Sequence, residues 1–303
     1  MQRKTMFVTL LALSLFLLPG IIRVQTVFAS YILGINDLKK HGGWNFQSFN
    51  LDDNTMAGLN YTGDSFKEME NLAYGGGNTY YGIESFNNTG KNSTLYSFEW
   101  DGDTVTGTAG ENTFDASNID AATFVDGLLY AFDNNTDMLT KINLDGEKVG
   151  ETKVTGFDSK KKFEGLAYGS DGLLYGSLTK GGNSWLYSMD ITNPNIVANE
   201  IGKIQLGKKS FGQVEALTFL DDVLYGVGGK GWKNNPLIKI DTGNGSVFGE
   251  PVNWGSGDIE GIAAGGSAAV PEPATILLLG FGLLGFAGSG IKKFMGKLRR
   301  EVH

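Results

Sequence analysis

The chain has 303 residues, 12% aromatic side chains, a formal net charge of −8 and no cysteine. Disulfides, thiolate metal sites and cysteine nucleophiles are therefore excluded, and with only two histidines so are zinc sites built from several histidines. Both ends are basic, so residues 30–270, with 17 Lys and Arg against 31 Asp and Glu, carry −14. Such an acidic body repels phosphate backbones, and we expect no nucleic-acid partner.

The N-terminus has the features of a signal peptide. Arg3 and Lys4 precede an apolar stretch from Met6 to Leu18, and Val27-Phe28-Ala29 supplies small residues at a cleavage site. The alternative is a retained membrane anchor, but the stretch is shorter than the roughly 20 apolar residues that a spanning helix needs. We predict a signal peptide over residues 1–29 and an exported body.

The body repeats one pattern. Each repeat has an acidic residue, a short apolar strand, a Gly/Asp turn, a Leu-Tyr-Gly strand, a polar loop and a third apolar strand. Successive acidic residues are 44 to 51 residues apart, and they are Glu70, Asp120, Glu164, Glu215 and Glu260. Periods in this range are typical of β-propeller blades.

Each repeat accommodates up to four short strands. The first is apolar nearly throughout, as expected of strands packed on both faces, at residues 72–74, 166–168 and 217–220. The fourth is more polar and suits an outer edge, at residues 104–109, 148–154, 199–206 and 246–253. The sequence therefore predicts small antiparallel sheets with an apolar inner strand and a polar outer strand.

The fifth repeat is divided between the two ends of the body. Residues 260–264 supply only a first strand, whereas residues 31–34, 45–51 and 55–61 supply the other three. A ring of sheets has to bury the exposed faces of its first and last members, and one sheet shared by both ends achieves this. We predict an all-β, five-bladed β-propeller over residues 30–264. An open stack of hairpins is the alternative.

The five acidic residues are the most informative candidate site. Inner strands of a propeller line its central channel, so Glu70, Asp120, Glu164, Glu215 and Glu260 should form a ring. Carboxylates this close repel one another unless they are protonated, hydrogen-bonded or bridged by a cation such as calcium. A calcium site is one hypothesis. The others are that each carboxylate caps local backbone amides, or that the ring supplies catalytic groups.

Loops that carry tryptophan next to amide residues are candidates for glycan binding. Trp44, Trp185 and Trp232 occur at comparable places in three repeats, each near an asparagine. Sugars present apolar ring faces and hydroxyl rims, which suit aromatic side chains with nearby amides. The alternative is that some of these tryptophans pack between the sheets, and Trp185, beside an apolar strand, is the strongest candidate for that.

The C-terminal segment reads as a sorting signal. A flexible linker over 265–270 leads to Pro271-Glu272-Pro273, an apolar run over 274–291 and a basic end. As a helix those 18 residues measure about 27 Å, just enough to span a bilayer core, and the basic end should stay cytoplasmic. Residues 271–303 resemble the PEP-CTERM tail of exopolysaccharide-producing bacteria. The resemblance implies handling by an exosortase-type enzyme, with Pro271, Glu272 and Pro273 as its recognition motif.

These observations leave three interpretations of function. The first is an exported, non-catalytic component of the cell envelope or extracellular matrix that binds polysaccharide. The second is a calcium-dependent hydrolase or lyase acting on extracellular polymer or phosphoester, with the acidic ring as metal site or as a paired acid and base. The third, a protein-interaction scaffold, overlaps with the first.

Overall fold

The computed structural model describes residues 30–38, 43–85, 92–228, 235–255 and 258–265. The predicted signal peptide, the linker beyond Gly265 and the sorting tail lie outside these ranges. Within them the chain is all-β. No helix in this part of the chain is long and apolar enough to cross a membrane.

The strands form antiparallel units of four. Unit A contains β22 (Ile259–Gly265), β1 (Tyr31–Leu38), β2 (Gly43–Asn50) and β3 (Thr55–Gly63). Unit B contains β4 (Ala73–Gly76), β5 (Thr79–Glu84), β6 (Ser93–Trp100) and β7 (Thr104–Phe114). Unit C contains β8 (Ile119–Val125), β9 (Leu128–Asp133), β10 (Met138–Ile142) and β11 (Lys148–Thr155).

Two further units complete the body. Unit D contains β12 (Lys162–Tyr168), β13 (Leu174–Lys180), β14 (Asn183–Met189) and β15 (Ile196–Lys203). Unit E contains β18 (Val214–Leu220), β19 (Val223–Gly228), β20 (Pro236–Ile240) and β21 (Val247–Asn253). A small hairpin of β16 (Gln205–Leu206) and β17 (Lys209–Ser210) lies between D and E in the chain.

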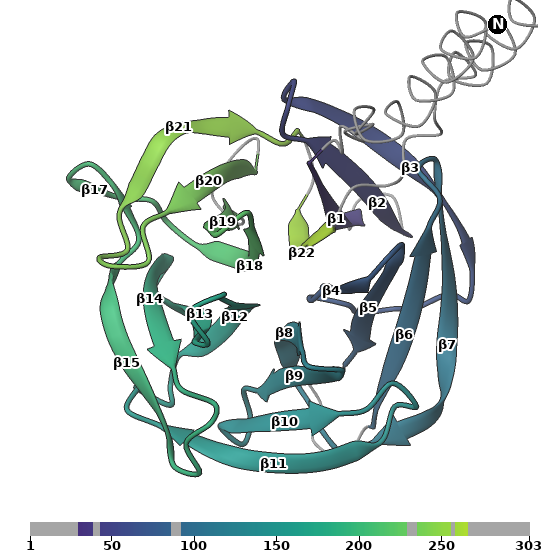
Figure 1. Cartoon of the computed structure of the whole chain (residues 1–303), viewed down its shortest axis with the longest axis horizontal. Helices are drawn as coiled ribbons and strands as arrows, with labels where there is room; N and C mark the ends of the chain where they lie inside the picture. The colour runs from purple at the N-terminus through teal and green to yellow at the C-terminus, as the bar shows by residue number, and fades with distance from the viewer. Residues whose placement is uncertain (1–29, 39–42, 86–91, 229–234, 256–257, 266–303) are drawn as a thin grey trace, which may run out of the picture.

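The units surround a common centre, with the first strand of each innermost and the fourth outermost (Figure 1). The innermost strands contact one another around the whole circuit, in the order β4, β8, β12, β18, β22 and back to β4. Outer strands join some neighbours: β3 pairs in parallel with β7, and β11 with β15. The arrangement therefore has no open end among its inner strands.

The two ends of the body pair within unit A. Strands β1 and β22 run antiparallel, from Tyr31 opposite Gly265 to Asn36 opposite Ile259, which confirms the pairing predicted from the divided repeat. Behind this pair, Trp254 is fully buried and its ring lies 5.4 Å from that of Phe49. A Cβ at Gly34 would come within 2.8 Å of the Trp254 ring, so glycine is required here.

The hydrophobic core lies between units. Each of the hydrophobic clusters in the described chain combines side chains from two neighbouring units, and together they cover every junction of the circuit. Between C and D, for example, the Phe132 and Phe163 rings are 4.7 Å apart and both are fully buried. A Cβ at Gly176 would approach Phe163 to 2.7 Å, which explains the glycine of that Leu-Tyr-Gly strand. The stability of each unit thus depends on its neighbours.

The predicted strands differ from the observed ones mainly at the polar edge. The outer strand expected at residues 199–206 is β15, Ile196–Lys203, three residues earlier. β15 carries a bulge at Ile201 opposite β14, and an extra residue of this kind displaces the strand from the positions that the repeat pattern predicts. The inner strands β12 and β18 begin earlier than predicted, so that they include the acidic residues.

Candidate functional site

The acidic residues occupy β-bulges in the innermost strands. In β8, β12 and β18 the pairing register skips one residue, and in each strand it is the acidic one: Asp120, Glu164 and Glu215. Glu260 is skipped in the same way where β22 pairs with β1, whereas Glu70 precedes β4. A bulge re-aims the side chain of its extra residue. The chain therefore turns these carboxylates out of the regular pleat.

Three of the five carboxylates line one small cavity at the centre of the circuit. Its lining includes Glu70, Asp120 and Glu164, and its volume is about 10 Å³, the space of about one water molecule. Glu70 shares a side-chain hydrogen bond with Asp120, which requires one proton between the two carboxyl groups. Glu164 lies within electrostatic reach of Glu70 and Glu215. We call this region the acidic end.

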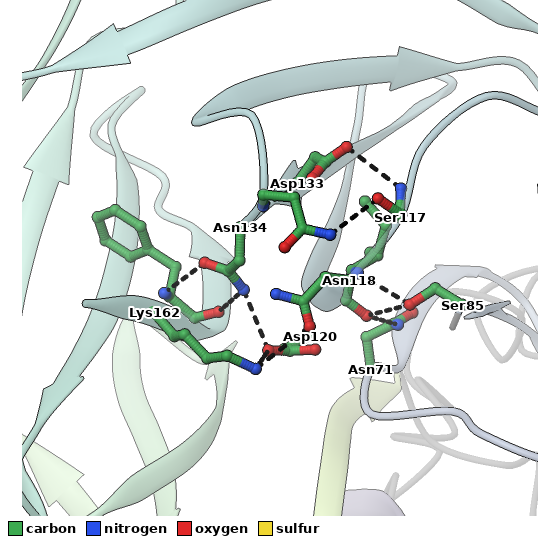
Figure 2. Close-up of polar contacts among 11 residues, drawn as sticks. Asn71, Ser85, Ser117, Asn118, Asp120, Asp133, Asn134 and Lys162 are labelled. Atoms are coloured by element: carbon green, nitrogen blue, oxygen red, sulfur yellow. Dashed lines mark hydrogen bonds and ion pairs between the residues drawn. The ribbon is translucent and has the colours of Figure 1, made fainter. Parts of the chain in front are cut away.

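A lysine from the same chain neutralises part of this charge. The Lys162 Nζ donates to Asp120 Oδ2 at 3.1 Å and to Asn118 Oδ1 at 3.2 Å, joining unit D to unit C (Figure 2). The Asp120 side chain is 4% exposed and that of Lys162 47%. Lys162 was missed in the sequence, although it stands two residues before Glu164, where the other repeats have Glu68, Asn118, Gln213 and Asp258.

Polar side chains also hold the residue directly before three of the carboxylates. Asn134 accepts a bond from the Phe163 amide at 2.8 Å and donates to the Phe163 carbonyl at 3.0 Å and to Asp120 Oδ2 at 3.1 Å (Figure 2). Ser85 binds the Ile119 amide at 2.8 Å, and Ser184 binds the Val214 amide at 2.9 Å. Each of these side chains belongs to the preceding unit. Amide and hydroxyl groups, and not the carboxylates, bind these three backbone amides.

The environment shifts the pKa of each central charged group. Burial raises the pKa of Asp120, opposed by the hydrogen bond from Glu70 and by the charge of Lys162. Burial also raises the pKa of Glu164 to about 7, and nearby Glu215 and Glu70 add to this while Lys162 opposes it. Burial alone would lower the pKa of Lys162, but Asp120, Glu164 and Glu70 raise it. The acidic end therefore keeps protons near neutral pH and a charged lysine.

The side chains of the acidic end differ from the ligand set that calcium requires. Within the described ranges, no group of three or more His, Asp or Glu side chains is arranged to hold a metal ion. Calcium takes six to eight oxygen ligands, and an ammonium group among the carboxylates opposes a second cation. The acidic end as it stands does not fit a site in which all five carboxylates share calcium.

The other end of the same strands has a different lining. Four residues after each acidic residue lies an aromatic side chain in four repeats, namely Tyr74, Phe124, Tyr168 and Phe219, and Ala264 in the fifth. All of them line a second cavity of about 150 Å³, which we call the aromatic end. Leu72, Leu166, Leu217 and Ile262 line both cavities and separate the two ends.

A larger cleft of about 340 Å³ lies away from the centre, between strands β5 to β7 of unit B and the β10–β11 turn of unit C. It is lined partly by Leu95, Thr108, Asn112 and Leu144. Its one aromatic side chain, Tyr81, is already stacked on Phe124 with the ring centroids 5.8 Å apart. This cleft lies on the outer surface, and the Asn112 side chain there donates to the Asp145 carbonyl at 2.8 Å.

Of the three tryptophans predicted to bind glycan, the structure describes the side chain of Trp185 only. Trp185 lies in β14, partly buried against the cluster between units C and D, with the Lys161 and Lys203 ammonium groups 5.2 and 5.4 Å from its ring. The protein itself thus covers much of this ring. Trp232 and the side chain of Trp44 lie outside the described residues, so a joint glycan site stays a prediction.

Comparison with known proteins bears on the tail. Residues 269–293 match the PEP-CTERM protein-sorting motif, which confirms the resemblance carried by Pro271, Glu272 and Pro273. The match implies export, a membrane-associated sorting tail and processing by an exosortase-type enzyme. No curated protein matches the chain by sequence.

Solved structures are similar to the body at low identity. A candidate 6-phosphogluconolactonase from Bacteroides fragilis is 13% identical with a TM-score of 0.44, over 74% of this chain and 81% of that one. One from Bacteroides uniformis is 13% identical with a TM-score of 0.41, over 74% and 68%. A chain of a nidogen/laminin complex is 13% identical with a TM-score of 0.43, over 78% and 98%.

Proposed function

We propose that the body is a five-bladed β-propeller and that it acts as a non-catalytic binding component of the cell envelope or extracellular matrix, with polysaccharide as its ligand. In this proposal units A to E are the blades, and β1 and β22 close the ring. The sorting tail supports the location, because exosortase-processed proteins are delivered outside the cytoplasm. Whether the tail is then removed or kept as an anchor does not change the body.

The observation that carries the non-catalytic interpretation is the state of the acidic end. Lys162 supplies the positive charge that the calcium hypothesis assigned to a metal, and it contacts Asp120 directly at 3.1 Å. The cavity beside the carboxylates holds about one water molecule, so a sugar ring or phosphoester has no room there. The repeated carboxylates are best explained as parts of a polar network that joins the units.

One observation favours acid catalysis at the acidic end, and with it the hydrolase or lyase as a second candidate. Glu164, with its pKa raised to about 7, lies beside the hydrogen-bonded pair of Glu70 and Asp120. A carboxyl group that titrates near neutral pH suits a general acid. Rearrangement of Lys162 would have to open the acidic end before a substrate could reach it.

Binding to immobilised polysaccharide tests the proposal. The full chain, purified in mild detergent, is applied to an array of neutral and anionic exopolysaccharides, and calcium is titrated separately by calorimetry. We expect retention on at least one polymer without loss of polymer length, and neither heat nor a change in melting temperature with calcium. Absence of retention on every polymer overturns the glycan ligand. Calcium-dependent shortening of a polymer, lost in Glu164→Gln, would establish the second candidate.

A further inference from the structure

The aromatic end combines features that point to a ligand of definite size. Two of its aromatic rings pack against aromatic rings of the preceding unit. Phe124 stacks on Tyr81 with the ring centroids 5.8 Å apart, and Phe219 lies edge-on to Tyr175 at 5.5 Å. Ala264 stands where the pattern would place a fifth ring. The four aromatic side chains are only partly buried, whereas Ala264 is 6% exposed. Ala264 thus leaves space that a fifth aromatic ring would fill.

The volume of the cavity matches one six-membered ring. A cavity of about 150 Å³ in a protein interior is large enough for benzene, and the aromatic end has this volume. Its inner boundary consists of Leu72, Leu166, Leu217 and Ile262, beyond which the acidic end offers only about 10 Å³. A polymer therefore cannot thread through the centre, and only the end of a chain fits.

Polar groups among the aromatic rings distinguish a sugar from a hydrocarbon. The hydroxyl groups of Thr123 and Thr218 are part of the lining. Thr218 Oγ1 accepts a bond from the Ala264 amide at 2.8 Å, which leaves its own proton to donate. The Thr123 hydroxyl makes no side-chain hydrogen bond within the described part of the chain. An apolar ligand would leave these hydroxyls unsatisfied, whereas the hydroxyls of a sugar would pair with them.

Charge limits which sugar fits. The body carries −14, and the acidic end lies on the same axis behind the apolar boundary. An anionic sugar residue would be repelled on approach and would find no basic side chain among the described residues that line the cavity. We propose that the aromatic end binds the terminal residue of a neutral glycan as a single pyranose ring. This inference rests on the glycan binding proposed above and names the part of the ligand that is recognised.

Monosaccharides test the site directly. Methyl glucoside, methyl galactoside and methyl mannoside are titrated into the full chain, with binding followed by saturation-transfer NMR, and glucuronic acid serves as the anionic comparison. We expect at least one neutral glycoside to bind and glucuronic acid to give no signal. Ala264→Phe should weaken binding at least a hundredfold by filling the cavity, and the matched Ala57→Phe change on exposed β3 should leave it unchanged.

A conservative variant keeps the test valid if Ala264→Phe fails to fold. Thr123→Val keeps the shape of the side chain and removes its hydroxyl, and should weaken the glycoside about tenfold. Unchanged affinity in both variants, or no binding by any neutral glycoside, overturns the inference. Retention on polysaccharide that no monosaccharide displaces would overturn the inference alone and leave the proposed function standing. Glycoside binding without retention on any polymer would overturn polysaccharide as the ligand and leave the site for a single pyranose ring standing.

Discussion

The acidic end and the aromatic end lie at opposite ends of the same inner strands. They differ in whether the polar side chains there are hydrogen-bonded by other residues of the chain. At the acidic end Asp120 is bound by Glu70, Asn134 and Lys162, all from this chain. At the aromatic end the cavity is fifteen-fold larger, and Thr123 makes no side-chain hydrogen bond within the described residues. The strongest sequence signal therefore marks the region that holds the units together, and the weaker signal marks the region with room for a ligand.

The difference between the two ends also shows what can be learned from positions that recur in every repeat and from positions that do not. The carboxylate that recurs in every repeat is explained by the polar network that joins the units, whereas the departures from the pattern are local: Lys162 at the acidic end and Ala264 at the aromatic end. A position that repeats is more informative about assembly. A position that breaks the repeat is more informative about function.

The largest expected effect comes from removing the cation of the acidic end. Lys162→Met leaves Asp120 and its neighbours without their positive partner. We expect a loss of about 3 kcal/mol in the free energy of unfolding, at the lower end of the cost of breaking a buried pair, because Lys162 is half exposed. Urea denaturation measures this. Lys180→Met removes an exposed ion pair with Asp158, 3.5 Å long, and should cost less than about 0.5 kcal/mol. Equal losses in the two variants would show that the Lys162 contact at the acidic end contributes no more than an exposed ion pair.

The link between units C and D should be nearly as sensitive. Asn134→Ala removes three hydrogen bonds and leaves the amide of the fully buried Phe163 without its acceptor, so we expect a loss of about 2 kcal/mol. Thermal unfolding monitors this change, which corresponds to roughly 4 to 8 °C in a body of this size. Asn199→Ala on exposed β15 is the matched control and should shift the midpoint by less than 2 °C, as expected for an exposed site. A shift no larger in Asn134→Ala would show that this network contributes little.

Glu164 should make stability depend on pH. Its folded pKa of about 7 lies above the ordinary value of 4.5, so the folded state keeps a proton that the unfolded chain has released. Stability therefore falls as pH rises from about 4.5 to about 7, by about 2 kcal/mol after allowance for partial exposure. Glu164→Gln should flatten this dependence, seen in urea midpoints at pH 5 and pH 8, while Glu250→Gln on exposed β21 should not. An unchanged slope in Glu164→Gln would place the titrating group elsewhere.

The smallest effect on stability is expected at the aromatic end. The Tyr168 hydroxyl makes no hydrogen bond within the described residues, so Tyr168→Phe should change the free energy of unfolding by less than about 0.5 kcal/mol. If the Tyr168 hydroxyl donates to a sugar hydroxyl, the same change should weaken glycoside binding severalfold, measured by NMR titration. The Tyr74 hydroxyl, in contrast, donates to the Gly77 carbonyl at 3.2 Å, so Tyr74→Phe should cost more stability. A large loss of stability in Tyr168→Phe would show that this hydroxyl is bonded within the folded chain and is not available to a ligand.

Much of the fold was predictable because it repeats. The 44- to 51-residue period and the divided fifth repeat predicted which strands pair, including β1 with β22. The bulges could not be predicted, since an extra residue in a strand becomes visible only against the register of its partner. Lys162 was missed because it occurs in one repeat and so is absent from the shared pattern. An aromatic residue occurs at this position in every aligned repeat but one. The cavity that these residues line could not be predicted, because its size depends on how far apart the units lie across the centre of the circuit.

The pairing of the first and last strands of the body has a consequence for the order of events during export. A chain that crosses a membrane from its N-terminus delivers β1 first, and β1 then lacks its partner until nearly the whole body has emerged. Long-range pairing of this kind is slow and leaves an unpaired strand edge exposed in the meantime. Because β22 ends at Gly265 and the sorting motif begins at Pro271, the signal for processing emerges almost together with the strand that completes the fold. We expect export and folding to finish together, so that the processing enzyme encounters a chain in which β22 can pair with β1.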